Sequence, residues 1–480
     1  MRATSGSGGS SGSGGTASTT RAVHESADTM TYESSDGVPR ICVVGGGFGG
    51  LYTAIKLEQL MWPRGVKPRV VLVDQNDRFS FKPLLYDVLT ESATSDEVAP
   101  LYSSMLAPYS VSFVQGTVCG IEGGQVVLQD GEKISYDWLV MALGAKTNSF
   151  GVPGVEEYAL QFSVYEDAVR LQEELKRVAE EKKGKFPEIC IVGGGYAGVE
   201  LAAALSDRLA GACQIRLVTS GGDIMEPAPY GQRQAARNVL DSDGVSVMCN
   251  TIVERIQIAG GDEDGSGGKR IIQAKRLDDG TKDVLEADIV LWTAGQVPAV
   301  KEYSDSIPFP TDDYGSIKTD RTLKVVGTET VFALGDVAVR GMDGMHLPAT
   351  AQVAFQQADY VAWNIWSSIN KKPLLNFQYQ HLGEMMSLGS TKGAVSLPIP
   401  VPPPISAAIK QGPLGDVLKA VGVSVNTTFG GASDGITIEG PFGALLRRAA
   451  YLYRQPTDEQ KVQVIRSWAK KAGIPGPKTN

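Results

Sequence analysis

Two glycine-rich stretches carry the clearest chemistry in the sequence. RICVVGGGFGGLYTAIKL spans residues 40–57, and EICIVGGGYAGVELAAAL repeats it at an offset of 148 residues. The repeated glycines are Gly45, Gly47 and Gly50 in the first copy and Gly193, Gly195 and Gly198 in the second. In G-x-G-x-x-G, the first glycine permits a tight turn, the second lets backbone approach a pyrophosphate, and the third lets helix and strand pack closely. Each copy therefore predicts a dinucleotide site at the N-terminus of a helix.

The residues that end the second strand of each unit differ between the copies. RVVLV is followed by Asp74, whose carboxylate can accept hydrogen bonds from a ribose diol. QIRLV is followed by Thr219 and Ser220, which would not repel the 2′-phosphate of NADPH as a carboxylate would. The second site is therefore expected to accept NADPH at least as well as NADH. The alternative is that groups outside the motif bind the ribose, and two candidate phosphate partners are Arg233 and Arg237.

Each glycine turn has to lie between a strand and a helix for this chemistry to work. Hydrophobic periodicity predicts strands at 40–44, 69–73, 188–192 and 214–218, with helices from about 48 to 59 and from the second turn to about 209. Residues 162–183 combine helical periodicity with heavy charge, as in a solvated connecting helix. We predict an α/β fold with two Rossmann-like domains and a C-terminal amphipathic, membrane-associating region.

Composition excludes several other chemistries. The net charge of −9 argues against nucleic acid as a partner. The five cysteines include no C-x-x-C or similarly close pair, so a flavin disulfide reductase is excluded, and Cys42 and Cys190 are expected to be small core residues. With only three histidines, no metal site is expected.

Two dinucleotides in one chain predict an electron relay in which FAD takes hydride from NADPH or NADH. YDWLVMALGAKTN (136–148) supports the pairing, since its strand is followed by small residues that could lie beneath an adenine or pyrophosphate. In FALGDVA, Gly335 and Asp336 fit a strand end whose carboxylate binds the ribityl hydroxyls.

Three further stretches narrow the comparison. FSFKPLLYDVLTES (79–92), LPATAQVAFQQADYVAWNIW (347–366) and FQYQHLGEMMSLGS (377–390), together with the glycine loops and ADIVLWTAG, resemble the type II NAD(P)H:quinone oxidoreductases, most of all their plastid, plastoglobule-associated C-type branch. The resemblance covers about residues 38–475, and it implies that residues 377–390 form a pair of strands. It implies a non-proton-pumping enzyme that passes two electrons from FAD to a membrane prenylquinone such as plastoquinone or phylloquinone.

The resemblance also implies roles for individual residues. Glu200 would assist proton delivery near quinone and nicotinamide, although capping electrostatics alone could explain an acid in a first helical turn. Gln352 and Gln356, one turn apart, could bind a flavin carbonyl or a quinone oxygen, or form only a polar helix edge. FSFKPLLY would be an isoalloxazine segment. The predicted cofactor contacts are Gly45, Gly47, Phe48, Gly49, Gly50, Asp74, Lys82, Pro83, Leu84, Val118, Ala142, Gly144, Gly193, Gly195, Tyr196, Ala197, Gly198, Thr219, Ser220, Ala294, Gly295, Gly335, Asp336, Ala351 and Gln352.

Two features depart from the family pattern. Some bacterial relatives have a lysine where Leu382 stands, so a lysine-based proton path is absent or differently built. Residues 398–431 are longer and richer in proline than the pattern, which leaves the quinone entrance undefined.

The C-terminal segment combines apolar and basic residues at helical spacing. Phe442, Leu445, Ala449 and Leu452 fall on one face, with Arg447, Arg448 and Arg454 expected on the opposite side or at the edges. The following segment adds Val462, Ile465 and Trp468 among basic residues. Such helices lie in an anionic membrane interface. Packing on the chain's own domain, or across a homodimer, is the alternative.

The predicted domains are 1–37, disordered or transit-like; 38–150 with 320–395, binding FAD; 151–319, binding NAD(P)H; and 396–480, a Pro-rich linker with the amphipathic region. Residues 1–37 are Ser/Gly/Thr-rich without an acid before Glu25, which fits either a disordered tail or an organelle transit peptide. The resemblance favours a plastid over the mitochondrial inner membrane. Two other functions stay open: a soluble-acceptor flavin reductase of the ferredoxin-reductase type, and a nucleotide-binding lipid-body protein with little turnover.

Overall fold

The computed structural model describes most of the chain. The described residues are 37–63, 67–182, 184–260, 268–339, 341–342, 345–399, 413–420, 423–426 and 435–471. The predictions for the transit-like segment and for most of the Pro-rich segment concern residues outside these ranges.

The first parallel sheet has the strand order β18-β7-β1-β2-β3. Its strands are β1 (Arg40–Val44), β2 (Arg69–Asp74), β3 (Val111–Gln115), β7 (Trp138–Met141) and β18 (Val331–Ala333). Near it lie α1 (Phe48–Gln59), η2 (Lys82–Leu84), α2 (Leu85–Leu89), α3 (Ser95–Val98), α4 (Tyr102–Leu106), η4 (Gly335–Val337) and α9 (Ala351–Ile369). The late strand β18 and helix α9 thus complete a unit begun by the first glycine loop.

The second parallel sheet has the order β12-β11-β10-β16-β9. Its strands are β9 (Ala159–Leu160), β10 (Glu188–Val192), β11 (Gln214–Val218), β12 (Ser246–Met248) and β16 (Ile289–Trp292). Its helices are α5 (Val155–Tyr158), α6 (Tyr165–Lys182), α7 (Tyr196–Arg208) and α8 (Tyr230–Ser242). The predicted strand–turn–helix–strand order is confirmed in both units.

Smaller sheets join and extend the two units. They contain β4 (Val118–Glu122), β5 (Gln125–Leu128), β6 (Lys133–Ser135), β8 (Ala145–Thr147), β13 (Thr251–Ala259), β14 (Lys269–Arg276), β15 (Lys282–Ala287) and β17 (Gln296–Pro298). Strands β8 and β17 pair antiparallel, which ties the ends of the two units together. Remaining short elements are η3 (Ala299–Ser306), β19 (Gly341–Met342) and β20 (Met345–His346).

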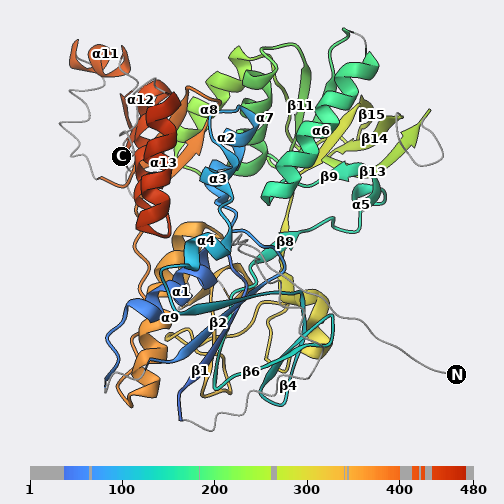
Figure 1. Cartoon of the computed structure of the whole chain (residues 1–480). Helices are drawn as coiled ribbons and strands as arrows, with labels where there is room; N and C mark the ends of the chain where they lie inside the picture. The colour runs from blue at the N-terminus through green and yellow to red at the C-terminus, as the bar shows by residue number, and fades with distance from the viewer. Residues whose placement is uncertain are drawn as a thin grey trace, which may run out of the picture.

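The C-terminal region is built on a four-stranded sheet with the order β21-β22-β24-β23. Its elements are β21 (Glu384–Ser387), β22 (Gly393–Leu397), α11 (Pro413–Ala420), β23 (Val423–Asn426), β24 (Gly435–Glu439), α12 (Gly440–Tyr453) and α13 (Asp458–Lys471). Figure 1 shows the two α/β units one above the other, with α12 and α13 side by side along the left edge. Strand β21 places this region against α7 of the nucleotide unit.

One predicted pair of strands is wrong. Residues 377–390 were expected to form two strands, but only Glu384–Ser387 is a strand, and it pairs with Gly393–Leu397. The backbone of residues 380–383 is held by glutamine side chains of α9 instead, so it does not need a strand partner.

The cores confirm the assignment of two cysteines. Cys42 and Cys190 lie in separate apolar clusters and are each 1% exposed or less. Burial raises the pKa of both thiols to about 12, so neither is a thiolate at neutral pH.

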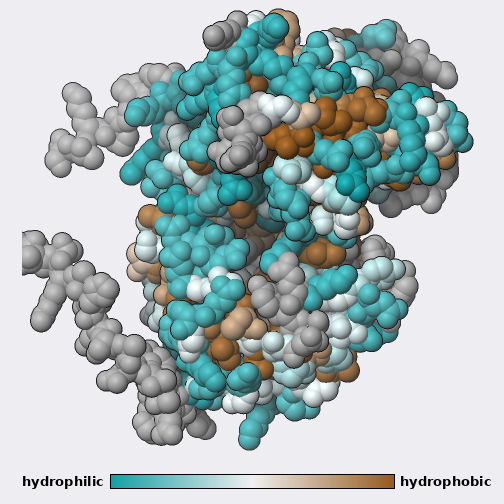
Figure 2. Space-filling model, turned by 90° about the vertical axis from the view of Figure 1, so that its right-hand side faces the viewer, coloured by the Kyte–Doolittle hydropathy of each residue, from teal (hydrophilic) through white to brown (hydrophobic). Residues whose placement is uncertain are grey.

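One side of the molecule is mainly hydrophilic. Figure 2 shows the side away from α12 and α13, where a mainly hydrophilic surface carries a hydrophobic patch on the upper unit. Within the described ranges, no helix is both long and apolar enough to cross a bilayer. The same ranges contain no cluster of His, Cys, Asp and Glu suited to a metal ion.

Candidate functional site

The two glycine loops have nearly the same geometry. Gly45 and Gly193 have positive φ angles of 98° and 121°, which side chains rarely adopt. A Cβ added at Gly50 would lie 1.8 Å from the carbonyl oxygen of Gly45, and one at Gly198 would lie 1.9 Å from that of Gly193. Helix and strand therefore approach so closely that only glycine fits.

The middle glycine of each loop faces open space. A Cβ at Gly47 or Gly195 would meet no described atom within 4 Å, and each residue caps a helix whose first turn receives no described side-chain cap. Unpartnered helix N–H groups beside open space are what a pyrophosphate needs. Both loops thus fit the phosphates of a dinucleotide.

Asp74 lies where a ribose-binding carboxylate is expected. Its two oxygens accept hydrogen bonds from the backbone N–H of Gly46 at 2.6 Å and of Asn76 at 2.8 Å. Burial raises the pKa of Asp74, while these two N–H groups act in the opposite direction. Tyr102, which sequence reasoning missed, donates to the Gly46 carbonyl at 2.8 Å and packs where a side chain at 46 would lie.

Thr219 is the spatial counterpart of Asp74. Gly45 N–H donates to Val73 and Gly193 N–H donates to Val218, both at 2.8 Å, so the residue after each valine occupies the same place. Thr219 is buried against Gly194, and Ser220 is exposed. No carboxylate stands at this position.

The candidate phosphate-binding arginines are already paired. Arg237 contacts Asp223 at 2.5 Å and Arg233 contacts it at 3.6 Å. Thr293, which sequence reasoning also missed, packs against Gly193 and Gly198 through its hydroxyl. It occupies the place that Ala142 has beside Gly45.

The remaining predicted flavin contacts surround the first loop. Phe48 packs edge-on against Phe79 and Phe81, with ring centroids 5.2 Å apart in each pair. Gly335 has a φ of 71°, and its N–H donates to the side-chain oxygen of Gln357 at 2.7 Å. Asp336 lines a hollow with Ala145, Gln296, Val297 and Pro298, beside the β8–β17 pair.

The other predicted contacts lie in the η2 turn and next to the two glycine loops. Lys82, Pro83 and Leu84 form η2, in which the lysine is exposed and Leu84 is buried. Gly49 lies against Leu334, and Gly144 faces open space. Val118 packs in an apolar core with Ile121, so its side chain serves packing. Ala142, Ala197, Ala294, Gly295 and Ala351 lie on or directly after the strands and helices that flank the two loops.

Glu200 is the acid that the structure sets apart. It is 7% exposed, and one carboxyl oxygen accepts a 2.7 Å hydrogen bond from the backbone N–H of Ser387 in β21. Burial raises the pKa of Glu200 to about 8, and Asp87 acts in the same direction. The Ser387 hydrogen bond and Arg447 lower it by less. A carboxyl group in this environment is protonated near neutral pH and can donate a proton.

Gln352 and Gln356 bind the chain's own backbone. Gln352 donates to the Gly383 carbonyl at 3.0 Å and accepts from Leu382 N–H at 2.9 Å. Gln356 donates to the Gln380 carbonyl at 2.8 Å and accepts from its N–H at 3.0 Å. Their amides hold residues 380–383 beside α9, and their predicted contact with flavin or quinone stays a prediction.

Tyr196 links the second loop to this region. Its hydroxyl lies 2.8 Å from Gln232 Oε1 and also hydrogen bonds with the Glu384 carboxylate. The nucleotide loop and the C-terminal sheet therefore meet directly.

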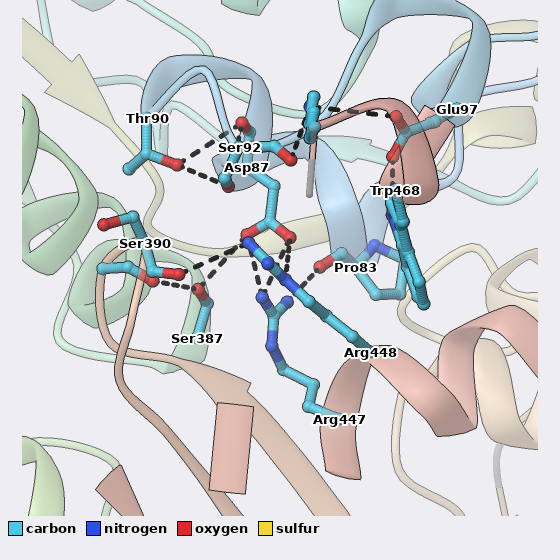
Figure 3. A network of polar contacts seen from close by, with 12 residues as sticks. Pro83, Asp87, Thr90, Ser92, Glu97, Ser387, Ser390, Arg447, Arg448 and Trp468 are labelled. Atoms are coloured by element: carbon cyan, nitrogen blue, oxygen red, sulfur yellow. Dashed lines mark hydrogen bonds and ion pairs between the residues drawn. The ribbon is translucent and has the colours of Figure 1, made fainter. Parts of the chain in front are cut away.

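The predicted basic rim of α12 needs a correction. Arg447 is fully buried and ion-pairs with Asp87, because it points inward from α12 and not toward its opposite side or edges (Figure 3). Arg448 is partly exposed, and Arg454 lies over the Phe355 ring at 4.3 Å. The predicted apolar face stands, with Phe442 51% and Leu445 60% exposed.

These features define a class: an oxidoreductase with two dinucleotide loops and no redox cysteine pair in the sequence. The sequence pattern of the pyridine nucleotide-disulphide oxidoreductases matches residues 39–358. The structure of NDH2 from Plasmodium falciparum in complex with NADH has the same fold, with a TM-score of 0.70, 16% identity, and coverage of 91% of this chain and 99% of that one.

Curated relatives then give the narrower family. The alternative NAD(P)H-ubiquinone oxidoreductase C1, chloroplastic/mitochondrial, of Arabidopsis thaliana is 39% identical over 457 residues, 91% of this chain and 81% of the relative. The demethylphylloquinone reductase NdbB of Synechocystis is 38% identical over 441 residues, 90% and 96% of the two chains. The chain belongs to the type II NAD(P)H:quinone oxidoreductase family.

Proposed function

We propose that the chain is a FAD-dependent NAD(P)H:prenylquinone oxidoreductase that does not pump protons. When bound, FAD accepts a hydride from NAD(P)H and returns two electrons to an acceptor. The first loop, Asp74 and Asp336 hold FAD, and the second loop with Thr219 holds the nicotinamide dinucleotide. Two observations support this assignment. Both glycine loops have the geometry that a pyrophosphate needs, and the relatives of the chain are named quinone reductases.

The observation that carries the quinone half is the buried Glu200. Quinone reduction consumes two protons, and Glu200 is a protonated acid on the nucleotide helix α7, facing the C-terminal sheet. The glutamines of α9 shape the neighbouring segment 380–383. We assign proton donation to Glu200 and contact with the quinone oxygens to Gln352 and Gln356. On quinone binding, the two glutamine amides would give up hydrogen bonds to the backbone of residues 380–383 and form hydrogen bonds to the quinone.

The acceptor is proposed to reach the site from a membrane or lipid-body surface. Phe442, Leu445 and Ala449 on α12 and Val462 and Ile465 on α13 are exposed apolar residues. Basic residues of the same helices, including Arg466 and Lys470, can meet anionic headgroups. Together with the resemblance, this supports a peripheral membrane protein of an organelle, with the plastid favoured over the mitochondrion.

The first test is anaerobic stopped-flow of the purified protein. The flavin absorbance should bleach with NADPH or NADH and recover with a short-chain quinone such as decyl-plastoquinone. Bleaching without recovery would replace the quinone by a soluble acceptor. No bleaching would leave a nucleotide-binding protein and overturn the enzyme assignment.

The membrane contact is tested by vesicle flotation with a matched pair of variants. Leu445→Glu should reduce binding to anionic vesicles about tenfold, with turnover of a soluble quinone unchanged. The control is Val284→Glu, which charges a similarly exposed apolar residue on β15, on the side of the molecule away from α12 (Figure 1). Equal loss in both variants would refute a specific membrane contact of α12, and a change in sedimentation with unchanged flotation would instead assign the face of α12 to a homodimer.

A further inference from the structure

A buried ion pair joins helix α12 to the segment predicted to lie beside the flavin. Arg447 of α12 contacts both carboxylate oxygens of Asp87 of α2, at 2.8 and 2.9 Å. The two side chains are 1% and 2% exposed. Figure 3 shows them pointing toward each other from separate elements.

The pair reaches two parts of the proposed site through its other contacts. Arg447 also donates to the carbonyl of Pro83 at 3.2 Å, in the η2 turn. The hydroxyl of Ser387 lies 3.2 Å from the Gly389 carbonyl oxygen and 3.5 Å from an Asp87 oxygen, while the backbone N–H of Ser387 donates to Glu200 at 2.7 Å. The ion pair thus connects α12, α2 and η2. Through Ser387 of β21 it also reaches Glu200 on α7.

We propose that Asp87 and Arg447 are positioning residues for proton delivery: they fix Ser387, and through it the Glu200 carboxyl group, together with the Pro83 turn. Both side chains are at most 2% exposed, so the role assigned to them is to position other groups. This inference rests on the proposed function, in which Glu200 supplies a proton to the reduced acceptor.

Stability alone does not explain a charge pair at this place. Removing two charges from water is costly, and apolar residues of similar volume are often as stabilising as a buried ion pair. An apolar pair could not hold the Pro83 carbonyl or the Ser387 hydroxyl. It would also place no charge near Glu200, where Arg447 favours the ionised form and Asp87 the protonated form.

Among the described residues, four other titratable groups lie around Glu200. They are Tyr86 of α2, Tyr196 of α7, Tyr451 of α12 and, through its bond to Tyr196, Glu384 of β21. Burial raises the pKa of all three tyrosines above its ordinary value, so they stay neutral in the working range. Asp87 and Arg447 are the charges whose removal should shift the titration of Glu200 in opposite directions.

The test is the pH dependence of kcat in two single variants. Asp87→Asn leaves the positive charge of Arg447, which favours ionised Glu200, so the alkaline fall of kcat should move to lower pH by about one pH unit. At pH 8 this lowers kcat about fivefold, because less of the acid is protonated. Arg447→Gln removes the cation that favours ionised Glu200 and leaves Asp87 with Arg448 at 3.8 Å as a partner, so the fall should move to higher pH.

Two further variants separate charge from geometry. The double variant Asp87→Asn/Arg447→Gln removes both charges and should return the fall of kcat to the wild-type pH, with a lower plateau. Arg447→Lys keeps the charge but loses the bidentate contact, so it should lower the plateau and leave the pH profile in place. Lys182→Gln breaks the ion pair with Asp288 in the nucleotide unit and is the control for general damage, with an unchanged profile.

A second readout does not use turnover. Infrared spectroscopy follows the carboxyl C=O band of Glu200, which is identified by its loss in Glu200→Gln. The midpoint of its titration should move to lower pH in Asp87→Asn and to higher pH in Arg447→Gln. Shifts in one common direction, or no shift in either single variant while Glu200→Gln loses activity, would overturn the positioning role. If Glu200→Gln keeps full quinone turnover, the proposed proton donor fails instead.

Discussion

The two glycine loops are alike in backbone and different in the side chains around them. Their turns, close contacts and strand registers agree, down to the same 2.8 Å hydrogen bond from the first glycine to the second strand. The differences lie outside the glycines: Asp74 against Thr219, and Tyr52 against Glu200 at the same position of the helix. We therefore propose that the shared backbone binds pyrophosphate, and that the neighbouring side chains decide which dinucleotide binds and which reaction follows.

The largest expected effect comes from closing each loop with one methyl group. Gly50→Ala puts a Cβ 1.8 Å from a backbone oxygen in the first loop, and Gly198→Ala puts one at 1.9 Å in the second. We expect Gly50→Ala to lose FAD, with affinity reduced by more than about a hundredfold, or about 2.7 kcal/mol. Gly198→Ala should keep its flavin and lose reduction by NAD(P)H.

Flavin absorbance after gel filtration and anaerobic reduction by dithionite measure the two effects separately. Gly47→Ala and Gly195→Ala are the controls for folding, since their added methyl groups meet no described atom. Flavin loss from Gly198→Ala, with flavin kept by Gly50→Ala, would reverse the assignment of the two loops.

The sequence predicted the parts of the fold that depend on local pattern. Repeated glycines between apolar strands and helices identified both units, because turn geometry requires glycine at fixed spacing. The burial of Glu200 agrees with its sequence context, since the helix is otherwise apolar in GVELAAAL. The signal for Thr293 was available, because it follows a strand as Ala142 does in the first unit.

Residues that act through distant contacts could not be predicted. Arg447 reads as part of a basic rim because helical spacing does not reveal a partner 360 residues away. The amides of Gln352 and Gln356 are predicted to contact flavin or quinone, and helical spacing could not show that the extended backbone at 380–383 binds them as well. Only the tertiary fold brings these groups together.

Substitutions at Thr219 and Asp74, the matching positions at the end of the second strand of each unit, test which dinucleotide each loop prefers. Thr219→Asp introduces the carboxylate that the first unit has, so kcat/KM for NADPH should fall about tenfold to a hundredfold and that for NADH much less. Asp74→Ala should weaken FAD binding by about 1–2 kcal/mol through loss of its hydrogen bonds. Steady-state kinetics and flavin titration measure these effects, and an NADPH preference unchanged in Thr219→Asp would place phosphate recognition elsewhere.

Replacing Glu200 tests the chemistry that the second helix adds. The folded protein keeps this proton up to a pKa of about 8, whereas an unperturbed glutamate ionises near 4.5. Between these values the folded state binds more protons, so wild-type stability falls as pH rises. Glu200→Gln lacks this dependence, and its stability relative to wild type should rise by up to about 1.4 kcal/mol per pH unit in this window. Thermal unfolding at pH 5 and pH 8 measures the difference, and a constant difference would refute the raised pKa.

The smallest effect is expected at the matching position of the first helix. Tyr52 donates to the Arg454 carbonyl at the end of α12 and stacks with Phe355, so it holds the C-terminal helices in place without titrating. Burial raises the pKa of Tyr52 well above its ordinary value, so the phenol is neutral wherever the enzyme is folded. Tyr52→Phe keeps the ring and loses one hydrogen bond, which should cost about 1 kcal/mol in unfolding and leave the pH profile of kcat unchanged. A shifted profile in Tyr52→Phe would mean that both helices contribute to proton transfer, and the contrast between the two loops would then lie only in their nucleotides.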